Sequence, residues 1–111
     1  MSKQPFPPAV ADTISARSGG MCETWIAGTC NTRAEQIHHR KLRSQGGRHT
    51  VVGCIHICHR CHDYIHSHPR ESYANGWLVS AYADPAVSPV LRRGLRTLLR
   101  DDGRVFIDEE G

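Results

Sequence analysis

Hydrophobic and polar residues follow a helical period near the start of the chain. Residues 9–18 carry Val10, Ile14 and Arg17 at steps of three and four, and the pair of glycines that follows is typical of a helix C-terminus. Residues 1–8 show no such period and hold three prolines. We therefore expect a flexible leader over residues 1–8 and a short helix over residues 9–18.

The middle of the chain predicts two strands and a second helix. Residues 34–38 are typical of a brief strand, and residues 50–57 are β-branched and partly alternating, as in a strand or an extended segment. The segment between them has the composition of a loop and contains a glycine pair. Residues 58–68 fit a helix that Pro69 closes.

Turn signals divide the rest of the chain into shorter pieces. Residues 70–74 can add a helical turn, and residues 77–82 are typical of a strand. An Asp-Gly turn favours a hairpin over residues 97–107. A helix from Ser88, with leucines on one face, is the alternative for this region. With the hairpin, residues 71–111 form a C-terminal β extension of the same domain.

The composition indicates a small domain with a thin core. At 111 residues the chain fits one domain, and its apolar and aromatic fractions are 39% and 6%, so metal ligation would help to stabilise it. No apolar run approaches the ~20 residues of a membrane span, and the N-terminus lacks a signal-peptide stretch. We expect a cytoplasmic protein without a membrane partner. The oligomeric state stays open, and a monomer is compatible with the composition.

The charge pattern permits nucleic acid as a partner. The net charge is +3, and 12 of the 14 basic residues are arginine, whose planar guanidinium suits phosphate. The candidates for contacts with DNA phosphates are the basic residues closest in sequence to the histidines, Arg40, Lys41, Arg43, Arg48 and Arg60. We expect them to act as a group, because each one alone is equally typical of a solvated surface residue.

The five cysteines indicate a metal site with one cysteine left over. A reducing compartment keeps thiols available as ligands, and the two-residue spacer between Cys58 and Cys61 lets both sulfurs reach one tetrahedral ion. Cys22 and Cys30 can supply two further sulfurs, which predicts a structural zinc site. The alternative is that these cysteines are small buried hydrophobic residues. Cys54 is the expected leftover, packed in the extended segment.

The histidines carry the candidate chemistry. All thirteen histidines and cysteines lie between residues 22 and 68. His62 and His66 occupy positions i and i+4 of the expected helix, so they can bind a divalent ion from one side, while His38 approaches from the strand. Three imidazoles leave positions on the ion open for water and substrate. His39 points to the opposite side of the strand or twists beside the metal, so it is free to remain unligated and to act as a general base.

Four more histidines lie in the same neighbourhood, and we expect them on the surface or around the ligands rather than on the ion. They are His49, His56, His59 and His68. His56 and His59 would become rival ligands if the register of the helix were displaced. A zinc peptidase is a weaker explanation of the cluster, because no Glu lies between His62 and His66 to serve as the base.

The spacing of these residues resembles HNH endonucleases of the ββα-metal class, in particular the phage and mobile-element type with a cysteine zinc site. The nuclease domains of DNase colicins are similar in the double histidine and the His-x-x-x-His helix but lack the cysteines. The match covers about residues 17 to 68. It consists of His38-His39-Arg40, Gly46-Gly47 and Cys58-x-x-Cys61-His62-x-x-x-His66.

The resemblance implies an α+β fold, a small ββα-metal (His-Me finger) domain over residues 9–70 with a structural zinc site and the C-terminal β extension. It implies His39 as the general base. The implied ligands of a catalytic Mg²⁺, Mn²⁺, Ni²⁺ or Zn²⁺ are His38, His62 and His66. Those of the structural Zn²⁺ are Cys22, Cys30, Cys58 and Cys61. A bacterial or phage origin would accompany this family.

One position departs from the family. The central Asn, nine residues before the first helix histidine, falls on Gly53, and no Asn lies between His39 and His62. Since that Asn ties the loop of the base into place, its loss should loosen His39 without removing a metal ligand. A hydrogen bond from another loop residue can compensate, and the candidates are Ser44, Gln45 and His49.

The resulting hypothesis is a metal-dependent endonuclease or nickase that hydrolyses DNA phosphodiester bonds with weak sequence preference and strong salt dependence. The products would carry 5′-phosphate and 3′-hydroxyl ends. The main alternative is a catalytically weak or silent zinc-bound DNA-binding module, in which Gly53 marks the loss of activity. A structural zinc protein with two closed sites and no nucleic-acid role is a further alternative.

Overall fold

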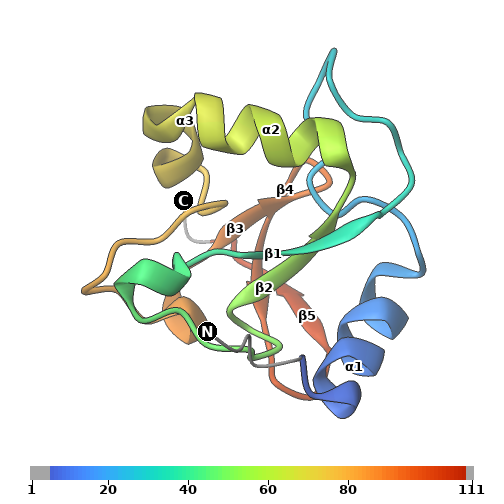
Figure 1. Cartoon of the computed structure of the whole chain (residues 1–111), viewed down its shortest axis with the longest axis vertical. Helices are drawn as coiled ribbons and strands as arrows, with labels where there is room; N and C mark the ends of the chain where they lie inside the picture. Colours follow the sequence, from blue (N-terminus) through green and yellow to red (C-terminus); the bar gives the residue numbers. More distant parts are fainter. Residues whose placement is uncertain (1–5, 110–111) are drawn as a thin grey trace, which may run out of the picture.

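The computed structural model describes residues 6–109, which fold into an α+β unit with antiparallel sheets (Figure 1). Its elements in chain order are α1 (Pro8–Ser18), β1 (Gln36–His39), the 3-10 turn η1 (Arg43–Gln45), β2 (Cys54–Ile57), α2 (His59–Ser67), α3 (Pro69–Ala74), the 3-10 turn η2 (Pro85–Val87), β3 (Val90–Arg92), β4 (Leu95–Leu99) and β5 (Val105–Ile107). None of the helices in this part of the chain is long and apolar enough to cross a membrane.

Helix α1 confirms the first predicted element and begins one residue earlier. Pro8 occupies the first turn, where its missing N–H costs nothing, and Gly19 ends the helix with φ 66° while donating its N–H to the Ser15 carbonyl. Of the expected leader, residues 1–5 lie outside the described residues, and Phe6 packs against a small cluster of buried residues under α1.

Strands β1 and β2 form an antiparallel pair that leads into α2. His38 pairs with Ile55 and His39 with Cys54, so the double histidine lies in the middle of the ladder. Helix α2 begins after Cys58, whose sulfur accepts the N–H of Cys61. Both predicted strands are present, although β2 starts at residue 54 rather than 50.

The C-terminal part forms a three-stranded sheet in the order β3-β4-β5. The hairpin between β4 and β5 turns at Gly103, as the Asp-Gly signal predicts. The alternative helix from Ser88 is wrong, because Arg93 and Gly94 both have positive φ and connect β3 to β4 in a two-residue turn. The strand expected at residues 77–82, all of them described, is also wrong: this segment is irregular.

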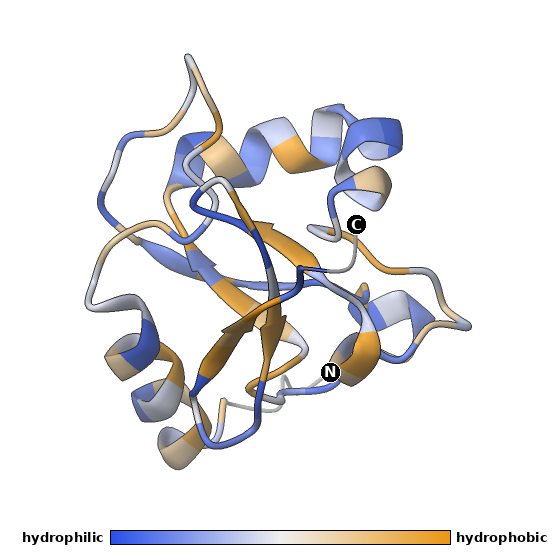
Figure 2. Ribbon diagram, turned by 180° about the vertical axis from the view of Figure 1, so that it is seen from behind, coloured by the Kyte–Doolittle hydropathy of each residue, from blue (hydrophilic) through white to orange (hydrophobic). Residues whose placement is uncertain are grey.

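One hydrophobic core joins the two sheets and α2. Its largest buried side chains come from β2, α2 and the C-terminal sheet, and they include Ile55, Ile57, Ile65, Val90 and Leu99. Figure 2 shows hydrophobic residues concentrated in the central strands, whereas the loops around them mix hydrophilic and hydrophobic residues. Residues 77–78 are buried in the same core, so the C-terminal segment packs directly on the elements that carry the histidines.

Candidate metal centre

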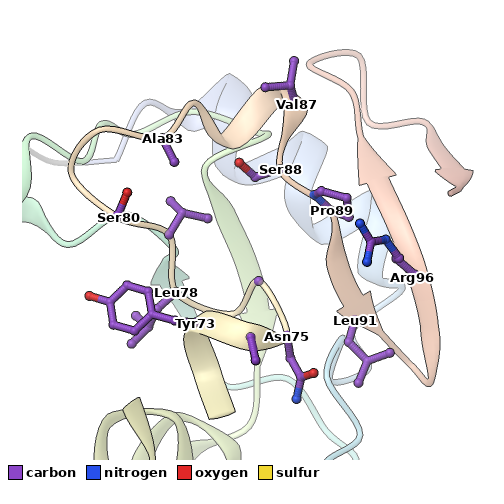
Figure 3. A pocket seen from close by; sticks show the side chains of 13 residues that line it. Tyr73, Asn75, Leu78, Ser80, Ala83, Val87, Ser88, Pro89, Leu91 and Arg96 are labelled. Carbon is purple, nitrogen blue, oxygen red and sulfur yellow. The ribbon is translucent and has the colours of Figure 1, made fainter. Parts of the chain in front are cut away.

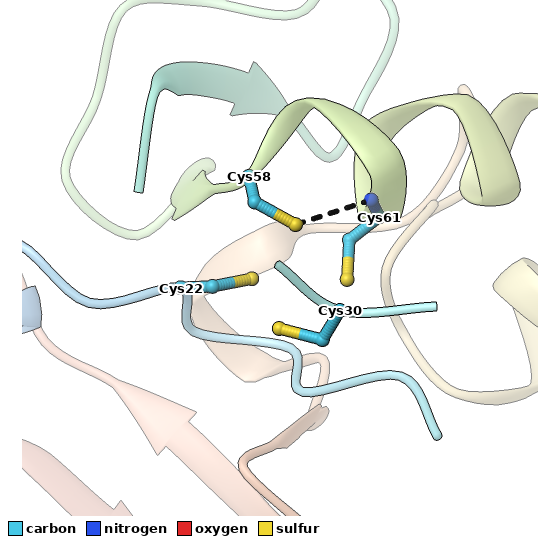
Figure 4. A group of neighbouring side chains, drawn as sticks. All are labelled: Cys22, Cys30, Cys58 and Cys61. Carbon is cyan, nitrogen blue, oxygen red and sulfur yellow. Dashed lines mark hydrogen bonds between the residues drawn. The ribbon is translucent and has the colours of Figure 1, made fainter. Parts of the chain in front are cut away.

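Four cysteines meet at the N-terminal end of α2 (Figure 4). Cys22 follows the glycines that end α1, and Cys30 returns to it through a turn in which its N–H bonds the Ile26 carbonyl. Cys58 is the N-cap residue of α2, and Cys61 lies in the first turn of that helix. The four sulfur atoms all lie within 4.8 Å of one another, so this cluster could hold a metal ion.

Backbone N–H groups point at the sulfurs of this cluster. Asn31 and Cys61 donate to the sulfur of Cys58 at 3.2 and 3.3 Å, and Thr32 donates to that of Cys30 at 3.3 Å. Such donors stabilise negative charge on sulfur, which is the form that binds a metal. The neighbouring Cys61 thiol holds the pKa of Cys22 well below its ordinary value, so one thiolate is already favoured. The donor set therefore fits a tetrahedral metal ion.

Cys54 lies outside this cluster, as expected of the leftover cysteine. It is fully buried with Ile14 and Val51 under α1, and burial raises the pKa of its thiol to about 12. A thiol that stays protonated in an apolar environment behaves as a small hydrophobic side chain.

Three histidines form a second group between β1 and α2. His38 comes from β1, and His62 and His66 come from successive turns of α2. One ring nitrogen of each lies within 4.8 Å of the other two. The Nε2 atoms of His62 and His66 are 3.2 Å apart, and nitrogens bound ~2.1 Å from one ion lie roughly 3.0–3.4 Å apart. The group could therefore hold a metal ion.

His38 is fixed in one tautomer. Its Nε2 donates to the Trp77 carbonyl at 2.8 Å, since a carbonyl oxygen only accepts. The neutral ring then carries its lone pair on Nδ1. Burial lowers the pKa of His38 to about 3, so the ring is neutral, as a ligand must be. His38 is 2% exposed, whereas His66 at the other side of the group is exposed, which leaves one edge of the site open.

His39 lies outside the three-histidine group and pairs with His49. Its Nε2 is 2.9 Å from Nδ1 of His49. Burial, together with the nearby His49 and Arg43, lowers the pKa of His39 below its ordinary value, so its imidazole is neutral near pH 7. An unprotonated imidazole beside a candidate metal ligand has the chemistry that a general base requires.

Gly53 is close to the same loop. Its N–H donates to the Thr50 hydroxyl at 3.1 Å, and its carbonyl accepts the N–H of Arg40 at 2.8 Å. A Cβ at position 53 would lie 2.6 Å from that hydroxyl, too close without a shift of the Thr50 side chain. The loop is therefore closed by Thr50, and a larger residue at position 53 would require the Thr50 side chain to move.

The other histidines have partners elsewhere. Nδ1 of His56 shares a hydrogen bond with the Ser18 hydroxyl. Nε2 of His59 lies 3.2 Å from the Asp63 carboxylate, and the ring of His68 stacks on that of Tyr64. None of these three belongs to the metal-ligand groups found among residues 6–109. The helix register is therefore the one that brings His62 and His66, not His59, next to His38.

The prediction that Arg40 contacts DNA is wrong. Its side chain is 0% exposed, and its guanidinium donates to five backbone carbonyls, those of Val52, Gly76, Pro85, Ser88 and Pro89. These bonds connect the loop after β1 to the C-terminal segment, so Arg40 is a structural residue. Arg43, Arg48 and Arg60 are exposed, and Lys41 is half-buried.

Sequence reasoning also missed a buried ion cluster. Glu23 is fully buried and accepts two hydrogen bonds from Arg17, each 2.8 Å, and one from Arg92 at 2.7 Å. It also accepts the backbone N–H of His56. The cluster connects α1, the first cysteine loop, β2 and β3. No sequence spacing signals it, because the two arginines lie 6 and 69 residues from Glu23.

A groove of about 530 Å³ lies between the end of α3 and the sheet strands β3 and β4 (Figure 3). Tyr73, Leu78 and Leu91 line it, and Arg96 is its one charged residue. No histidine, cysteine or carboxylate is among its described lining residues, so none of the usual protein ligands of zinc lines it.

Comparison of the chain with protein-family models, with curated proteins and with solved structures finds no significant match.

Proposed function

We propose that this chain is a metal-dependent DNA endonuclease or nickase of the HNH type, with β1, β2 and α2 as a ββα-metal unit. The observation that carries the proposal is the convergence of His38, His62 and His66 from a strand and a helix, with one edge open to solvent. A structural site uses closed coordination, whereas a catalytic site keeps a position for water or substrate.

In this proposal the cysteines hold a structural ion, and Zn²⁺ fits them best. Four thiolates in a tetrahedral arrangement are the usual donors of structural zinc. Sulfurs ~2.3 Å from a common ion lie roughly 3.8 Å apart, which is compatible with the upper limit of 4.8 Å in the cluster. Zinc would fasten the cysteine loop to the N-terminal end of α2, and thereby fix the helix that carries His62 and His66.

The chemistry at the histidines follows from the protonation of each ring. His39, neutral near pH 7, would take a proton from the water that attacks the phosphate. A divalent ion bound by His38, His62 and His66 would stabilise the charge that develops on the phosphate and on the leaving oxygen. The buried His38 stays neutral and is held by the Trp77 carbonyl, so it keeps its orientation during the reaction.

The DNA would be held mainly through its phosphates. Arg43, Arg48 and Arg60 are exposed basic residues on the elements next to the histidines, with Lys41 half-buried beside them. Phosphate contacts give affinity and salt dependence but little sequence information. Weak sequence preference and loss of activity at high salt are therefore expected.

Incubation of supercoiled plasmid with the zinc-loaded protein and Mg²⁺, Mn²⁺, Ni²⁺ or Zn²⁺ tests the proposal. Nicked or linear DNA is expected with at least one ion, and His39→Ala should abolish it while the protein stays folded. His59→Ala is the matched control, because His59 is exposed on α2 and its ring pairs with Asp63 and Gln36, which are outside the three-histidine group. Absence of cleavage with every ion would refute the nuclease and favour the silent DNA-binding module.

A further inference from the structure

The His39–His49 contact assigns a role to a residue outside the three-histidine group. We propose that His49 is the positioning residue of His39: it accepts the Nε2–H of His39 and thereby leaves the lone pair of that ring on Nδ1. This role rests on the proposed nuclease function, in which His39 is the base. The contact is 2.9 Å long and joins residues ten positions apart in the chain.

Only one proton can lie between the two facing nitrogens. If His39 donates from Nε2, its Nδ1 is unprotonated and can accept a proton from water. If His49 donates instead, His39 carries its proton on Nδ1 and has no lone pair free to act as a base. The hydrogen bond therefore decides whether His39 can react, in the same way that the partner of a catalytic imidazole sets its tautomer.

Packing holds both rings in this arrangement. The ring of Phe6 lies 4.3 Å from that of His49 and 5.4 Å from that of His39, measured between centroids. The two imidazoles are 5.0 Å apart and inclined by 49°. Contact of one aromatic ring with both imidazoles limits the rotation of each, so the hydrogen bond is kept in a narrow range of geometry.

The backbone of the loop determines where His49 emerges. Gly47 donates its N–H to the Leu42 carbonyl, and a Cβ at Gly47 would lie only 1.8 Å from the Lys41 carbonyl oxygen. Only glycine allows this close approach. Two residues later the chain presents His49 to His39, and Thr50 closes the loop onto Gly53. The loop is thus shaped to deliver this imidazole.

A pair of variants separates hydrogen bonding from packing. His49→Leu keeps a side chain of similar reach but removes the acceptor. His49→Asn places a carbonyl oxygen at the position of Nδ1, one bond from Cγ, and can accept the same hydrogen. His59→Leu is the control, since His59 lies outside the contact and is exposed. Plasmid cleavage gives kcat and KM, melting temperature reports folding, and long-range ¹⁵N–¹H spectra report which nitrogen of His39 carries the proton.

We expect kcat of His49→Leu to fall about 10- to 100-fold with little change in KM, the range seen when a partner that orients a functional imidazole is lost. His49→Asn should recover most of the rate, and the spectra should show the Nε2–H form of His39 in the parent and in His49→Asn. An unchanged rate in His49→Leu, or equal losses in both variants, would overturn the role. If the parent cleaves no DNA, the proposed nuclease function fails. In that case the spectra still test the hydrogen bond, because a Nδ1–H form of His39 would refute donation from His39 Nε2 to His49.

Discussion

The Nε2 atoms of His62 and His66 lie 3.2 Å apart on successive turns of α2. At this distance at most one proton can lie between the two facing nitrogens. Protonation of both rings would place two positive charges next to each other, which is repulsive. The proximity of His66 and burial both lower the pKa of His62, with burial the larger cause. The helix therefore holds the two rings ready for a common cation rather than for two protons.

His66→Ala should give a folded protein that loses the exchangeable ion and keeps the one bound by the cysteines. His66 is exposed, so its removal costs little packing. Cleavage should fall by more than the roughly 10- to 100-fold typical of losing a supporting partner of a metal site. Elemental analysis after dialysis and a melting curve measure both effects. His59→Ala on the same helix should retain both ions, and equal metal content in the two variants would contradict the assignment.

Cys58→Ser and Cys61→Ser should each prevent stable folding. Structural zinc contributes ~10–16 kcal/mol in small domains, which is comparable to or larger than the ~5–15 kcal/mol of total stability. Circular dichroism, with and without a chelator, measures the loss. Cys54→Ala is the control, because Cys54 is equally buried but outside the cluster, and it should cost only about 1 kcal/mol. A melting curve unaffected by chelator would show that no structural ion is present.

Glu23→Gln should destabilise the protein by roughly 3–5 kcal/mol near neutral pH, because it leaves Arg17 without its buried counter-charge. Burial alone would raise the pKa of Glu23, but the hydrogen bonds from Arg17 and Arg92 and the charge of Arg17 outweigh it and hold the pKa below the ordinary value of 4.5. The stabilisation is therefore fully present above about pH 4.5 and is lost as the pH falls through the lower, folded pKa.

Melting temperatures of the parent and Glu23→Gln between pH 3 and pH 7 provide the measurement, and the two are compared at each pH where both retain zinc. The difference between the two proteins should be constant near neutral pH and should shrink in acid, where the parent carboxylate becomes protonated and resembles the amide. A difference independent of pH over this range would show that the charge of Glu23 does not contribute.

Arg48→Gln should weaken DNA binding about equally for all sequences and lower the slope of log affinity against log salt by about 1, as for one lost phosphate contact. Arg48 is exposed on the loop that carries His49. Arg70→Gln is the control, since Arg70 is exposed on α3 and lies outside the group of candidate DNA contacts. Fluorescence anisotropy at several salt concentrations measures both. Identical slopes for the two variants would remove Arg48 from the DNA surface.

The sequence was sufficient to predict α1 and the strands and helix that bear the histidines of the candidate site. The helical period before Gly19, the β-branched residues before Cys58 and the Pro69 stop each have a local physical cause, and α1, β1, β2 and α2 form where these signals lie. The proximity of His62 and His66 follows from helix geometry alone. Their convergence with His38 needed only the antiparallel pairing of β1 with β2 and the short connection to α2.

The arginines and the C-terminal segment could not be predicted in the same way. Arg40 is buried because residues 76–89 fold over it and supply the carbonyls, and the sequence around Arg40 contains no sign of that distant segment. The apolar run at Trp77 suggested a strand, but its burial comes from packing in the core without ladder pairing. Long-range contacts determine the structure at such positions, whereas local sequence patterns indicate only the hydrophobic period and the type of turn.

Crystals of the zinc-loaded protein soaked in Mn²⁺ test the central claim most directly. Anomalous difference maps collected at the zinc edge and at a longer wavelength distinguish the two ions. The account predicts a zinc peak among the sulfurs of Cys22, Cys30, Cys58 and Cys61 and a separate manganese peak bonded to His38, His62 and His66. A map with density at the cysteines and none at the three imidazoles would contradict it.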